Sequence, residues 1–448
     1  MFQKIKNFYH LIQSLLVNLY YGFPARKMTI IGVTGTDGKT TTTSMIYQIL
    51  SQNGFNSAMI STILAKTKKE VFDTGLHITT PEPWDLPRIL SKFEKSGVTH
   101  VVIESTSSGL DQNRLFGISY DSVIITNIGS DHLDYHKTWK NYAKAKFKIV
   151  KKTQTEGLVV LNKDHKSKRW LNNQISKIKQ NIKIKWFSIN ELEDITHSIE
   201  GIKFRYQATD FKIPIIGEYN FSNALGVIKL AERYLELDQI ANSLQKFKTP
   251  LGRMQIMQKE PVRVIIDFAH TPSSLEEALS SVQDIKTSKD TRIICVFGCA
   301  GERDPERRKM GAVSTRMADI TVVTLEDPRT EVLRDINNEI IEHGKKEGGK
   351  LRKRFSSHQQ FSHYINNKMH VRKGDIFSFD YENIQNRKDA IDFALKIALK
   401  NDIVFITGKG HEQSLAIGSP IIEYEYNDQD TVKELLKKKT SSVIVIQS

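Results

Sequence analysis

One stretch, residues 30–50 with the sequence "IIGVTGTDGKTTTTSMIYQIL", constrains the fold more than any other. An apolar, strand-like run leads into Gly32, Gly35 and Gly38, and Lys39 then opens a helix-like run. A loop between a strand and a helix directs backbone N–H groups at an anion, and a lysine there adds positive charge. The stretch therefore predicts a phosphate-binding loop in an α/β domain.

The loop departs from the strict P-loop pattern in one place. That pattern has a glycine five residues before Gly38, where this chain has Val33. The physical argument survives, because the N–H groups and Lys39 can still face the phosphates of a nucleotide. The hydroxyl of Thr40 is a suitable oxygen ligand for Mg²⁺.

The surrounding sequence alternates short apolar runs with longer helical stretches. The runs "MTIIGVT", "THVVIES", "YDSVIITN" and "EGLVVLN" have the composition of buried parallel strands. Helices are predicted over residues 40–53 and 84–96, each followed by a glycine. We therefore expect a central P-loop mononucleotide-binding ATPase domain of the α/β class with a parallel sheet, over residues 28–249.

A second set of strands begins after residue 250. The runs "VRVIIDFAH", "TRIICVFG", "ADITVVTLEDP" and "NDIVFITGKG" each end in polar or glycine-rich residues. Ligands of open α/β sheets bind at the carboxyl ends of the strands. A length of 448 residues also suggests more than one domain. We expect residues 250–448 to form a Rossmann-like α/β domain.

Composition limits the possible partners and compartment. The two cysteines, Cys295 and Cys299, are too few for a disulfide framework and lack companion zinc ligands, which predicts free thiols and a cytoplasmic protein. The net charge of +14 arises from scattered lysines without a nucleic-acid-binding motif. We therefore expect no nucleic-acid partner, although the charge suits a phosphorylated substrate.

The first 27 residues form an amphipathic segment. Its apolar stripe is too short and interrupted to span a bilayer, and no signal-peptide cleavage site follows it. One interpretation is that the helix docks on the protein body or a partner; the other is peripheral membrane contact, assisted by Lys4, Lys6, Arg26 and Lys27. The stripe consists of Phe8, Leu11, Ile12, Leu15, Leu16 and Leu19.

Candidate metal ligands follow two of the predicted strands. Glu104 ends the run "VVIE", where a carboxylate suits a metal ion bound to a nucleotide. The segment "TNIGSDHLDYH" then supplies Asp131, His132, Asp134 and His136. Histidine can complete a site dominated by oxygen ligands. The alternative is that Asp131 and its neighbours cap the helix that starts near Trp139.

Three lysines follow in "YAKAKFK". Lys144, Lys146 and Lys148 are two residues apart, and on a helix this spacing cannot present all three to one site. From the residues alone we expect surface lysines.

The second half places charged residues at several strand ends. "LGRM" contains Arg253, "DFAHTP" contains Asp267 and His270, and "GERD", "EDPRTE" and "GKGHE" follow other strands. Arginines with glutamates suit a zwitterionic ligand, although each could also be a structural ion pair.

Taken together, these segments resemble the Mur ligase family, and within it the MurE-type tripeptide synthetases. The resemblance rests on "GVTGTDGKTTT", "ITTP", "ESTSSGLDQNR", "TNIGSDHLDYHKTWKNYAKAK", "GEYNFSNA", "GR", "DFAHTP", "VFGCAGERD", "EDPRTE" and "GKGHE". It implies an ATP- and Mg²⁺-dependent ligase of peptidoglycan precursor synthesis. In that reaction ATP converts a carboxylate into an acyl phosphate, an amine attacks it, and phosphate leaves.

The resemblance also assigns residues. It implies catalytic and metal roles for Lys39, Thr40, Glu104, His132 and a carbamylated Lys146. Those implied to bind ATP are Gly35, Thr36, Asp37, Gly38, Lys39, Thr40, Thr41, Asn220, Arg253 and Asp267. Those implied to bind the muramoyl-dipeptide are Thr79, Thr80, Thr106, Gln112 and Arg114. Those implied to bind the amino acid are Arg303, Glu326, Asp327, Pro328, Arg329, Gly408 and Glu412.

Two features bear on the substrates that the resemblance implies. Arg329 suits the distal carboxylate of meso-diaminopimelate, which we expect in preference to L-lysine, although Glu326 and Asp327 replace the Asp-Asn of diaminopimelate-adding members. The phosphate loop begins by residue 35, so we expect the family's N-terminal uridine-nucleotide domain to be absent. The UDP of UDP-N-acetylmuramoyl-L-alanyl-D-glutamate would then be held differently or by a partner, or the acceptor would be a non-UDP, carrier-linked or lipid-linked compound.

Two other functions remain open at this point. One is a Mur-related ligase for a different acid, of the folylpolyglutamate or cyanophycin type, which "DHLDYH" and "GKGHE" disfavour. The other is a regulatory or scaffold protein that has lost the chemistry, which Lys39, Glu104, His132 and Lys146 argue against. In every case we expect a monomer.

Overall fold

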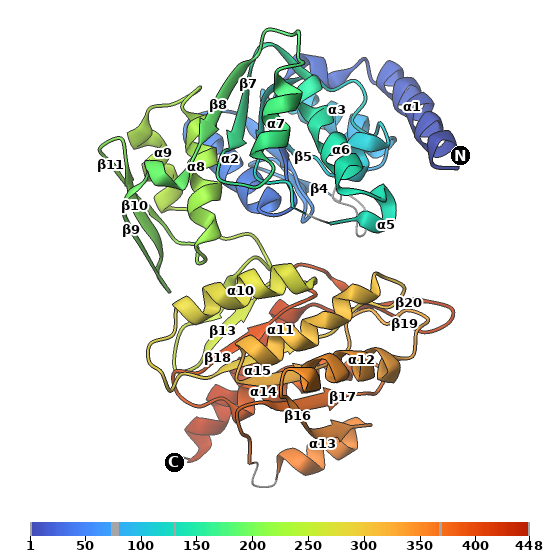
Figure 1. Cartoon of the computed structure of the whole chain (residues 1–448), viewed down its shortest axis with the longest axis vertical. Helices are drawn as coiled ribbons and strands as arrows, with labels where there is room; N and C mark the ends of the chain where they lie inside the picture. Colours follow the sequence, from blue (N-terminus) through green and yellow to red (C-terminus); the bar gives the residue numbers. More distant parts are fainter. Residues whose placement is uncertain (1, 73–79, 130, 367–369, 447–448) are drawn as a thin grey trace. The chain divides into compact units, whose positions relative to one another are not determined.

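The computed structural model describes residues 2–72, 80–129, 131–366 and 370–446. The chain divides into two compact units, Met1–Lys248 (unit 1) and Thr249–Ser448 (unit 2) (Figure 1). Both units are α/β, which confirms the predicted fold class.

In the described part of unit 1, eight strands form one sheet in the order β4–β3–β2–β5–β1–β6–β7–β8. Strands β2, β5, β1, β6, β7 and β8 are parallel, and β3 and β4 extend the edge antiparallel. The four strands predicted in this region are confirmed as β1, β5, β6 and β7. The bounds are β1 (Thr29–Thr34), β2 (Ser57–Ile60), β3 (Ala65–Lys66), β4 (Val71–Phe72), β5 (His100–Glu104), β6 (Tyr120–Ile125), β7 (Thr153–Asn162) and β8 (Lys183–Phe187).

Both faces of this sheet are buried. In β1, Ile30 belongs to one apolar cluster, whereas Ile31 and Val33 belong to another that includes α2 and α8. This explains why the strand is a continuous apolar run rather than an alternating one. The helices are α1 (Phe2–Tyr20), η1 (Pro24–Lys27), α2 (Lys39–Gln52), α3 (Asp85–Lys95), α4 (Ser107–Asp111), α5 (Leu133–His136), α6 (Trp139–Lys151), α7 (Lys168–Ile175), η2 (Ile189–Glu191), α8 (Tyr219–Ala231) and α9 (Leu237–Gln245).

A small antiparallel sheet was not predicted from the sequence. It consists of β9 (Glu193–Ser198), β10 (Gly201–Tyr206) and β11 (Thr209–Ile213), and β11 contacts α9. Phe204 and Phe211 stack within it at 5.2 Å between ring centroids and join the cluster beneath α8. The sheet therefore extends the core of unit 1.

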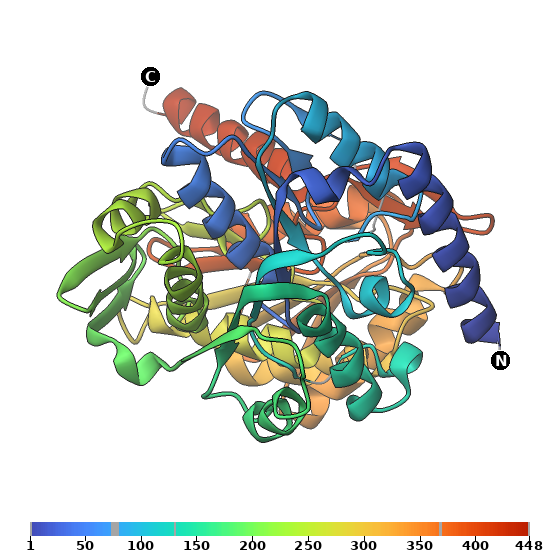
Figure 2. The same cartoon turned by 90° about the horizontal axis from the view of Figure 1, so that it is seen from above.

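Helix α1 packs on unit 1 through polar side chains, whereas most of the apolar stripe noted in the sequence is exposed. It contacts α3 and lies at the periphery of the unit in both views (Figures 1 and 2). Among the described residues, no helix is long and apolar enough to cross a membrane.

In the described part of unit 2, seven strands form a sheet in the order β12–β13–β18–β14–β15–β17–β16, parallel except for β12. The four strands predicted here are confirmed as β13, β14, β15 and β18. The strands are β12 (Gln255–Gln258), β13 (Arg263–Ile266), β14 (Ile293–Phe297), β15 (Ile320–Val323), β16 (Lys350–Phe355), β17 (Asp375–Phe379) and β18 (Ile403–Ile406), with a separate hairpin of β19 (Ser414–Ile417) and β20 (Ile422–Glu425).

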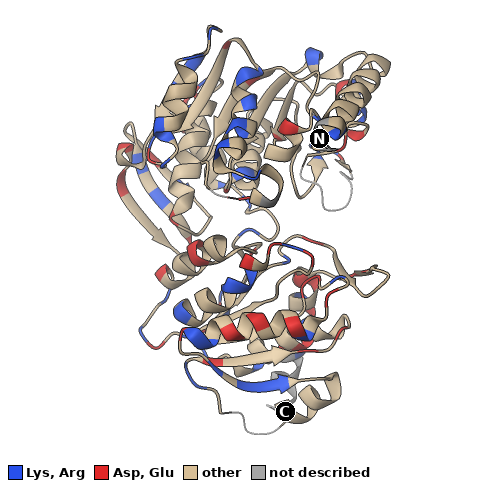
Figure 3. Ribbon diagram, turned by 45° about the vertical axis from the view of Figure 1, so that its right-hand side comes forward, with Lys and Arg blue, Asp and Glu red and all other residues tan. Residues whose placement is uncertain are grey.

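Helices cover this sheet as well. Ile294 and Val296 join a cluster with α14 and α15, and Cys295, between them, is buried near Ser314 of α11. The helices are α10 (Pro272–Asp284), η3 (Pro305–Lys309), α11 (Met310–Met317), α12 (Leu333–Lys346), α13 (His358–Ile365), α14 (Gln385–Ile397) and α15 (Asp428–Ile446). Lysines and arginines are distributed over both units and interspersed with acidic residues (Figure 3).

Candidate nucleotide and substrate sites

The predicted phosphate loop joins β1 to α2. Gly38 has φ 77° and precedes the first helical residue, and a Cβ on it would lie 2.3 Å from Oδ1 of Asn223. The side-chain oxygen of Asn127 accepts hydrogen bonds from the N–H groups of Thr36 and Asp37, each at 3.0 Å. Asn127 thus holds the loop by hydrogen bonds and Asn223 lies against Gly38, while the N–H groups of the first turn of α2 are the ones suited to an anion.

Glu104 lies beside this turn, as its place at the end of β5 predicted. Its buried carboxylate accepts hydrogen bonds from the hydroxyl of Thr40 at 3.0 Å and from the N–H and hydroxyl of Thr62 at 3.0 and 2.9 Å. These oxygens form a hard donor set of the kind that Mg²⁺ prefers, so the residues fit this ion. Thr62 was missed from the sequence, although it follows the carboxyl end of β2.

Lys146 approaches the same loop from α6. Its side chain is buried, its Nζ donates to the carbonyl oxygen of Gly35 at 2.6 Å, and the ammonium lies 4.4 Å from the ring centroid of Tyr142. Burial, reinforced by the nearby charge of Lys39, holds the pKa of Lys146 well below its ordinary value. Lys39 itself donates to the carbonyl oxygen of Thr36 at 2.7 Å.

The expectation of three surface lysines was therefore wrong for Lys146. Lys144 is exposed, and Lys148 pairs with Asp111 at 2.7 Å. Successive residues of a helix point about 100° apart, so lysines two positions apart face different surroundings. Only the orientation of α6 on the sheet determines which one is buried.

The histidine-rich segment is divided between two surroundings. His132 has φ 52° and an exposed ring whose Nε2 lies 3.4 Å from Oδ2 of Asp131. His136 is buried, with Nε2 3.0 Å from Oγ of Ser107 in α4. The cap of α6 is Thr138, which accepts from the N–H of Asn141, rather than Asp131. The Asp134 side chain lies outside the described part of the structure.

The predicted acceptor residues meet at the carboxyl end of β5. The hydroxyls of Thr80 and Thr106 are 2.9 Å apart, and Thr106 caps α4 by accepting from the N–H of Gly109. Nε of Arg114 donates to Oε1 of Gln112 at 2.8 Å, and the Arg114 guanidinium pairs with Glu82 at 3.0 Å. Nη1 of Arg114 also donates to the Thr80 carbonyl oxygen at 3.3 Å. Thr79 lies outside the described residues.

Asn220 lies in the first turn of α8. Its side-chain nitrogen donates to the carbonyl oxygen of Ile216 at 2.8 Å, and its oxygen accepts from Asn223 at 2.9 Å. Because Asn223 is the residue against Gly38, Asn220 is linked to the phosphate loop through one side chain. Asn223 was not singled out from the sequence.

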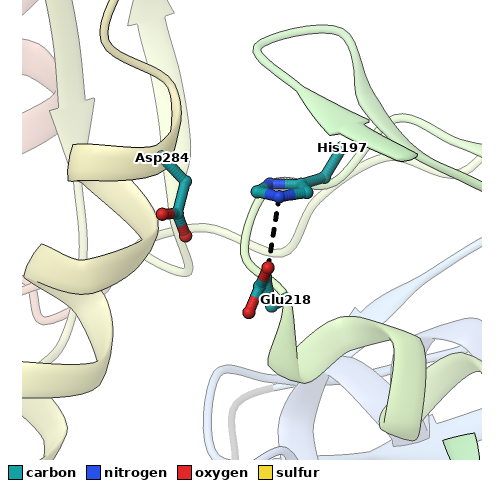
Figure 4. Close-up of side chains that lie close together, drawn as sticks. All are labelled: His197, Glu218 and Asp284. Atoms are coloured by element: carbon teal, nitrogen blue, oxygen red, sulfur yellow. Dashed lines mark ion pairs between the residues drawn. The ribbon is translucent and has the colours of Figure 1, made fainter. Parts of the chain in front are cut away.

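Figure 4 shows another polar pair of unit 1. Nε2 of His197 in β9 lies 3.2 Å from Oε1 of Glu218, the residue before α8. The pair joins the small sheet to the start of the helix that carries Asn220. This pair was not predicted from the sequence.

In unit 2, Asp267 organises the loop that contains Arg253. Its buried carboxylate accepts from the N–H groups of Met254 and Ala269, both at 2.8 Å, and burial raises its pKa. The Arg253 guanidinium lies 4.6 Å from the ring centroid of Phe268. Residues from "LGRM" and "DFAHTP" therefore share one cluster.

The segments "EDPR" and "GKGHE" also meet in unit 2. The carboxylate of Asp327 accepts from Nζ of buried Lys409 at 2.9 and 3.0 Å and from the N–H of Ala416 at 3.0 Å. Lys409 also pairs with Glu412 at 2.7 Å. The charge of Asp327 is thus offset within the protein, which the sequence did not indicate.

Glu326 and Arg329 flank this ion pair. Burial, together with the charge of Asp327, raises the pKa of Glu326 to about 7. Gly408 has φ 102°, and a Cβ there would lie 2.7 Å from Oε2 of Glu326. The backbone of Arg329 bonds to the β19 segment through its N–H to the Ala416 carbonyl at 3.0 Å.

The remaining predicted residues of this set are on the loops around it. The carbonyl of Pro328 accepts from the N–H of Glu331 at 3.0 Å and packs so closely on Gly301 that a side chain there would clash. Arg303 is exposed. Cys299 is buried, and burial raises its pKa to about 12.

These arrangements can be compared with known proteins. Residues 33–231 match the Mur ligase middle domain, and residues 252–410 match the Mur ligase glutamate ligase domain. The chain belongs to the Mur ligase family. Mur ligases are ATP-dependent enzymes that form amide bonds, which accounts for a phosphate loop and charged strand ends in one chain.

The sequences of individual relatives match most of the length of this Mur ligase. The UDP-N-acetylmuramoyl-L-alanyl-D-glutamate–2,6-diaminopimelate ligase of Clostridium perfringens is 32% identical and is matched over 95% of this chain and 82% of its own. The ligase of the same name from Aquifex aeolicus is 31% identical, over 93% and 79%.

Solved structures agree in fold. A diaminopimelate ligase structure with that same name superposes with a TM-score of 0.60 at 26% identity, covering 92% of this chain and 79% of its own. E. coli FolC in complex with ADP gives 0.65 at 17% identity, covering 96% and 94%, and shares the fold.

Proposed function

We propose that this Mur ligase joins an amino acid, meso-diaminopimelate in preference to L-lysine, to UDP-N-acetylmuramoyl-L-alanyl-D-glutamate in peptidoglycan precursor synthesis. The observation that carries the proposal is the contact of buried Lys146 with the phosphate loop, in a chain about one-third identical to diaminopimelate ligases. The contact brings an ionisable side chain to the loop in which ATP would be bound.

ATP would bind at the phosphate loop. The N–H groups at the start of α2 would donate hydrogen bonds to its phosphates, and Lys39 would leave the carbonyl of Thr36 to offset their charge. Thr40 and Glu104, with His132 and the modified Lys146, would hold Mg²⁺. When bound, Mg²⁺ supplies charge neutralisation as the ATP phosphate approaches the substrate carboxylate.

Lys146 suits the carbamylation implied by its motif. A neutral amine attacks CO₂, forming an N–C bond and releasing a proton to solvent. Burial of Lys146 favours the neutral amine that this step requires. The product is an anionic oxygen ligand, and it would replace the present donation of Nζ to Gly35.

The acceptor would bind beside Glu104. Arg114 is held by Gln112 and Glu82, which fixes its guanidinium for a carboxylate of the muramoyl-dipeptide. The hydroxyls of Thr80 and Thr106 would bond to the peptide portion. Thr79 belongs to the same motif.

The amino acid would bind in unit 2. Arg329 would pair with the distal carboxylate of meso-diaminopimelate, a group that L-lysine lacks. Glu326, Glu412 and Arg303 would complete the binding of the ammonium and carboxylate groups of the amino acid. Gly408, which has no side chain, would leave room for this ligand beside Glu326. Since Lys409 already neutralises Asp327, this residue shapes the loop instead of adding charge to the ligand.

The experiment is phosphate release from ATP with UDP-N-acetylmuramoyl-L-alanyl-D-glutamate and either meso-diaminopimelate or L-lysine. We expect release that depends on the amino acid and is faster with meso-diaminopimelate. A parallel assay replaces the acceptor by the same muramoyl-dipeptide without UDP. Absence of release with either amino acid on either acceptor would contradict the proposal.

A further inference from the structure

Helix α1 is held on unit 1 by a line of polar side chains. Nδ2 of Asn7 donates to Oδ2 of Asp111 at 3.2 Å, and Oγ of Ser14 donates to the Asn113 carbonyl at 3.1 Å. Nδ2 of Asn18 donates to the Phe116 carbonyl at 3.2 Å. Residues 7, 10, 14 and 18 share one face of the helix, on which His10 and Val17 are also buried. Hydrogen bonds to α4 and the residues that follow it thus mark the docked face.

The opposite face of α1 is apolar and exposed. An amphipathic helix on a globular protein normally buries its apolar stripe. Helix α1 instead buries its polar face and exposes its apolar one, an arrangement that we call inverted packing. With 19 residues at 1.5 Å each it is about 28 Å long. A contiguous apolar surface of this kind marks an interaction site. The exposed side chains are Ile5 (63%), Phe8 (62%), Tyr9 (58%), Ile12 (42%), Leu15 (39%), Leu16 (55%), Leu19 (58%) and Tyr20 (82%).

The charges around this apolar stripe favour a particular occupant. Helix α1 contains Lys4 and Lys6 and no acidic residue, and Arg26 and Lys27 follow in η1, where Lys27 pairs with Glu94 at 2.6 Å. Three of the exposed side chains are Phe8, Tyr9 and Tyr20, residue types suited to a membrane–water interface. A symmetric second copy would bring the same cations toward one another, which is unfavourable. An anionic lipid surface complements both the stripe and its cations.

We propose that α1 docks this ligase on an anionic lipid bilayer, with its axis in the plane of the surface. The apolar stripe enters the headgroup boundary, and the positive charge of the helix lies near the lipid phosphates. The proposal is independent of the amino acid that the enzyme adds. Because Asn7 bonds to Asp111, docking also holds the segment that precedes Gln112 and Arg114 near that surface.

The test is flotation of the full chain with vesicles of phosphatidylglycerol and phosphatidylcholine, compared with phosphatidylcholine alone. The unaltered protein should float with the anionic vesicles. The double variant Phe8→Glu, Leu16→Glu should bind on the order of 100-fold more weakly, because two large apolar side chains no longer enter the lipid. The matched control is Ile195→Glu, Leu399→Glu, which adds the same charge at exposed apolar positions elsewhere and should float normally.

Two outcomes would overturn the proposal. One is failure of the unaltered protein to float, or equal flotation of the α1 variant. The other is self-association without lipid, detected by analytical ultracentrifugation and abolished in the α1 variant, which would assign the stripe to a second copy. If the glutamate variant has a lower Tm than the unaltered protein, the double variant Phe8→Ser, Leu16→Ser replaces it. The same loss of flotation is expected for this variant.

Discussion

The Nζ of Lys146 and the carbonyl oxygen of Gly35 are 2.6 Å apart, although 111 residues separate them in sequence. This hydrogen bond joins the middle of α6 to the loop that follows β1. It brings a buried amine to the loop at which we propose that ATP and Mg²⁺ bind, so a substitution of this side chain tests the proposal directly.

Lys146→Ala should lower ligase activity by at least about 100-fold, because the oxygen ligand that we propose on Nζ would be lost. Lys144→Ala is the control, since that side chain is exposed two positions away and should leave activity unchanged. Phosphate release measures both. Depleting the buffer of CO₂ should slow the unaltered enzyme reversibly, and bicarbonate should restore it. Full activity of Lys146→Ala would refute the carbamate.

Gly38→Ala should lower stability by about 1–3 kcal/mol and weaken ATP binding, because its φ is positive and Asn223 occupies the space for a Cβ. Gly54→Ala provides the comparison. Gly54 also has a positive φ, 87°, but nothing lies within 4 Å of its Cβ position. Thermal unfolding and ATP titration should show a larger effect at Gly38. Equal effects would mean that backbone strain alone accounts for both.

Glu104→Gln should raise the Mg²⁺ concentration needed for half-maximal activity by at least about tenfold, because one carboxylate of the proposed site is lost. The glutamine side chain has nearly the same size as glutamate and can still accept a hydrogen bond from Thr62. Glu94→Gln, which removes a surface carboxylate paired with Lys27, is the control. A magnesium dependence unchanged by Glu104→Gln would place the ion elsewhere.

Glu326 predicts a pH dependence of stability. Its folded pKa of about 7 lies above the ordinary 4.5, so its contribution to folding is complete below about pH 4.5 and is lost as the pH rises through 7. The free energy of unfolding of Glu326→Gln, relative to that of the unaltered chain, should therefore rise by on the order of 3 kcal/mol between about pH 4.5 and pH 8. Denaturant unfolding at both pH values measures this. Glu276→Gln, at an exposed carboxylate, should show no such gain.

Arg329→Ala should reduce kcat/KM for meso-diaminopimelate by about 100-fold or more, because a charged hydrogen-bonding partner is removed from the distal carboxylate. The same variant should affect L-lysine little, since that substrate lacks the carboxylate. Arg352→Ala, at an exposed position of β16, is the control. An equal loss with both amino acids would indicate that Arg329 stabilises the loop instead.

Much of the fold followed from sequence pattern because buried parallel strands are continuous apolar runs. Strands such as β1 and β14 were identified for that reason. In contrast, β16, with the sequence "KLRKRF", is an edge strand rich in lysine and arginine. Its strand conformation depends on pairing with β17, a tertiary interaction that composition does not reveal.

The site was predictable where a residue's position along a strand fixed its location. Glu104 belongs to this class, because the last residue of a parallel strand lies at the ligand edge of the sheet. Lys146 belongs to the other class, since burial depends on how α6 is rotated against the sheet. The partnership of Asp327 with Lys409 could not be deduced either, because 82 residues separate the two.

The inverted packing of α1 has a practical consequence for anyone who shortens this chain. Removing the helix would uncover the carbonyl groups of Asn113 and Phe116, which accept hydrogen bonds from Ser14 and Asn18. It would also remove the hydrogen bond from Asn7 to Asp111, immediately before Gln112. Poor turnover of a truncated enzyme would thus reflect loosening of the segment around Gln112 and Arg114 as readily as lost lipid contact. Single side-chain changes on the exposed face of α1 separate these two effects.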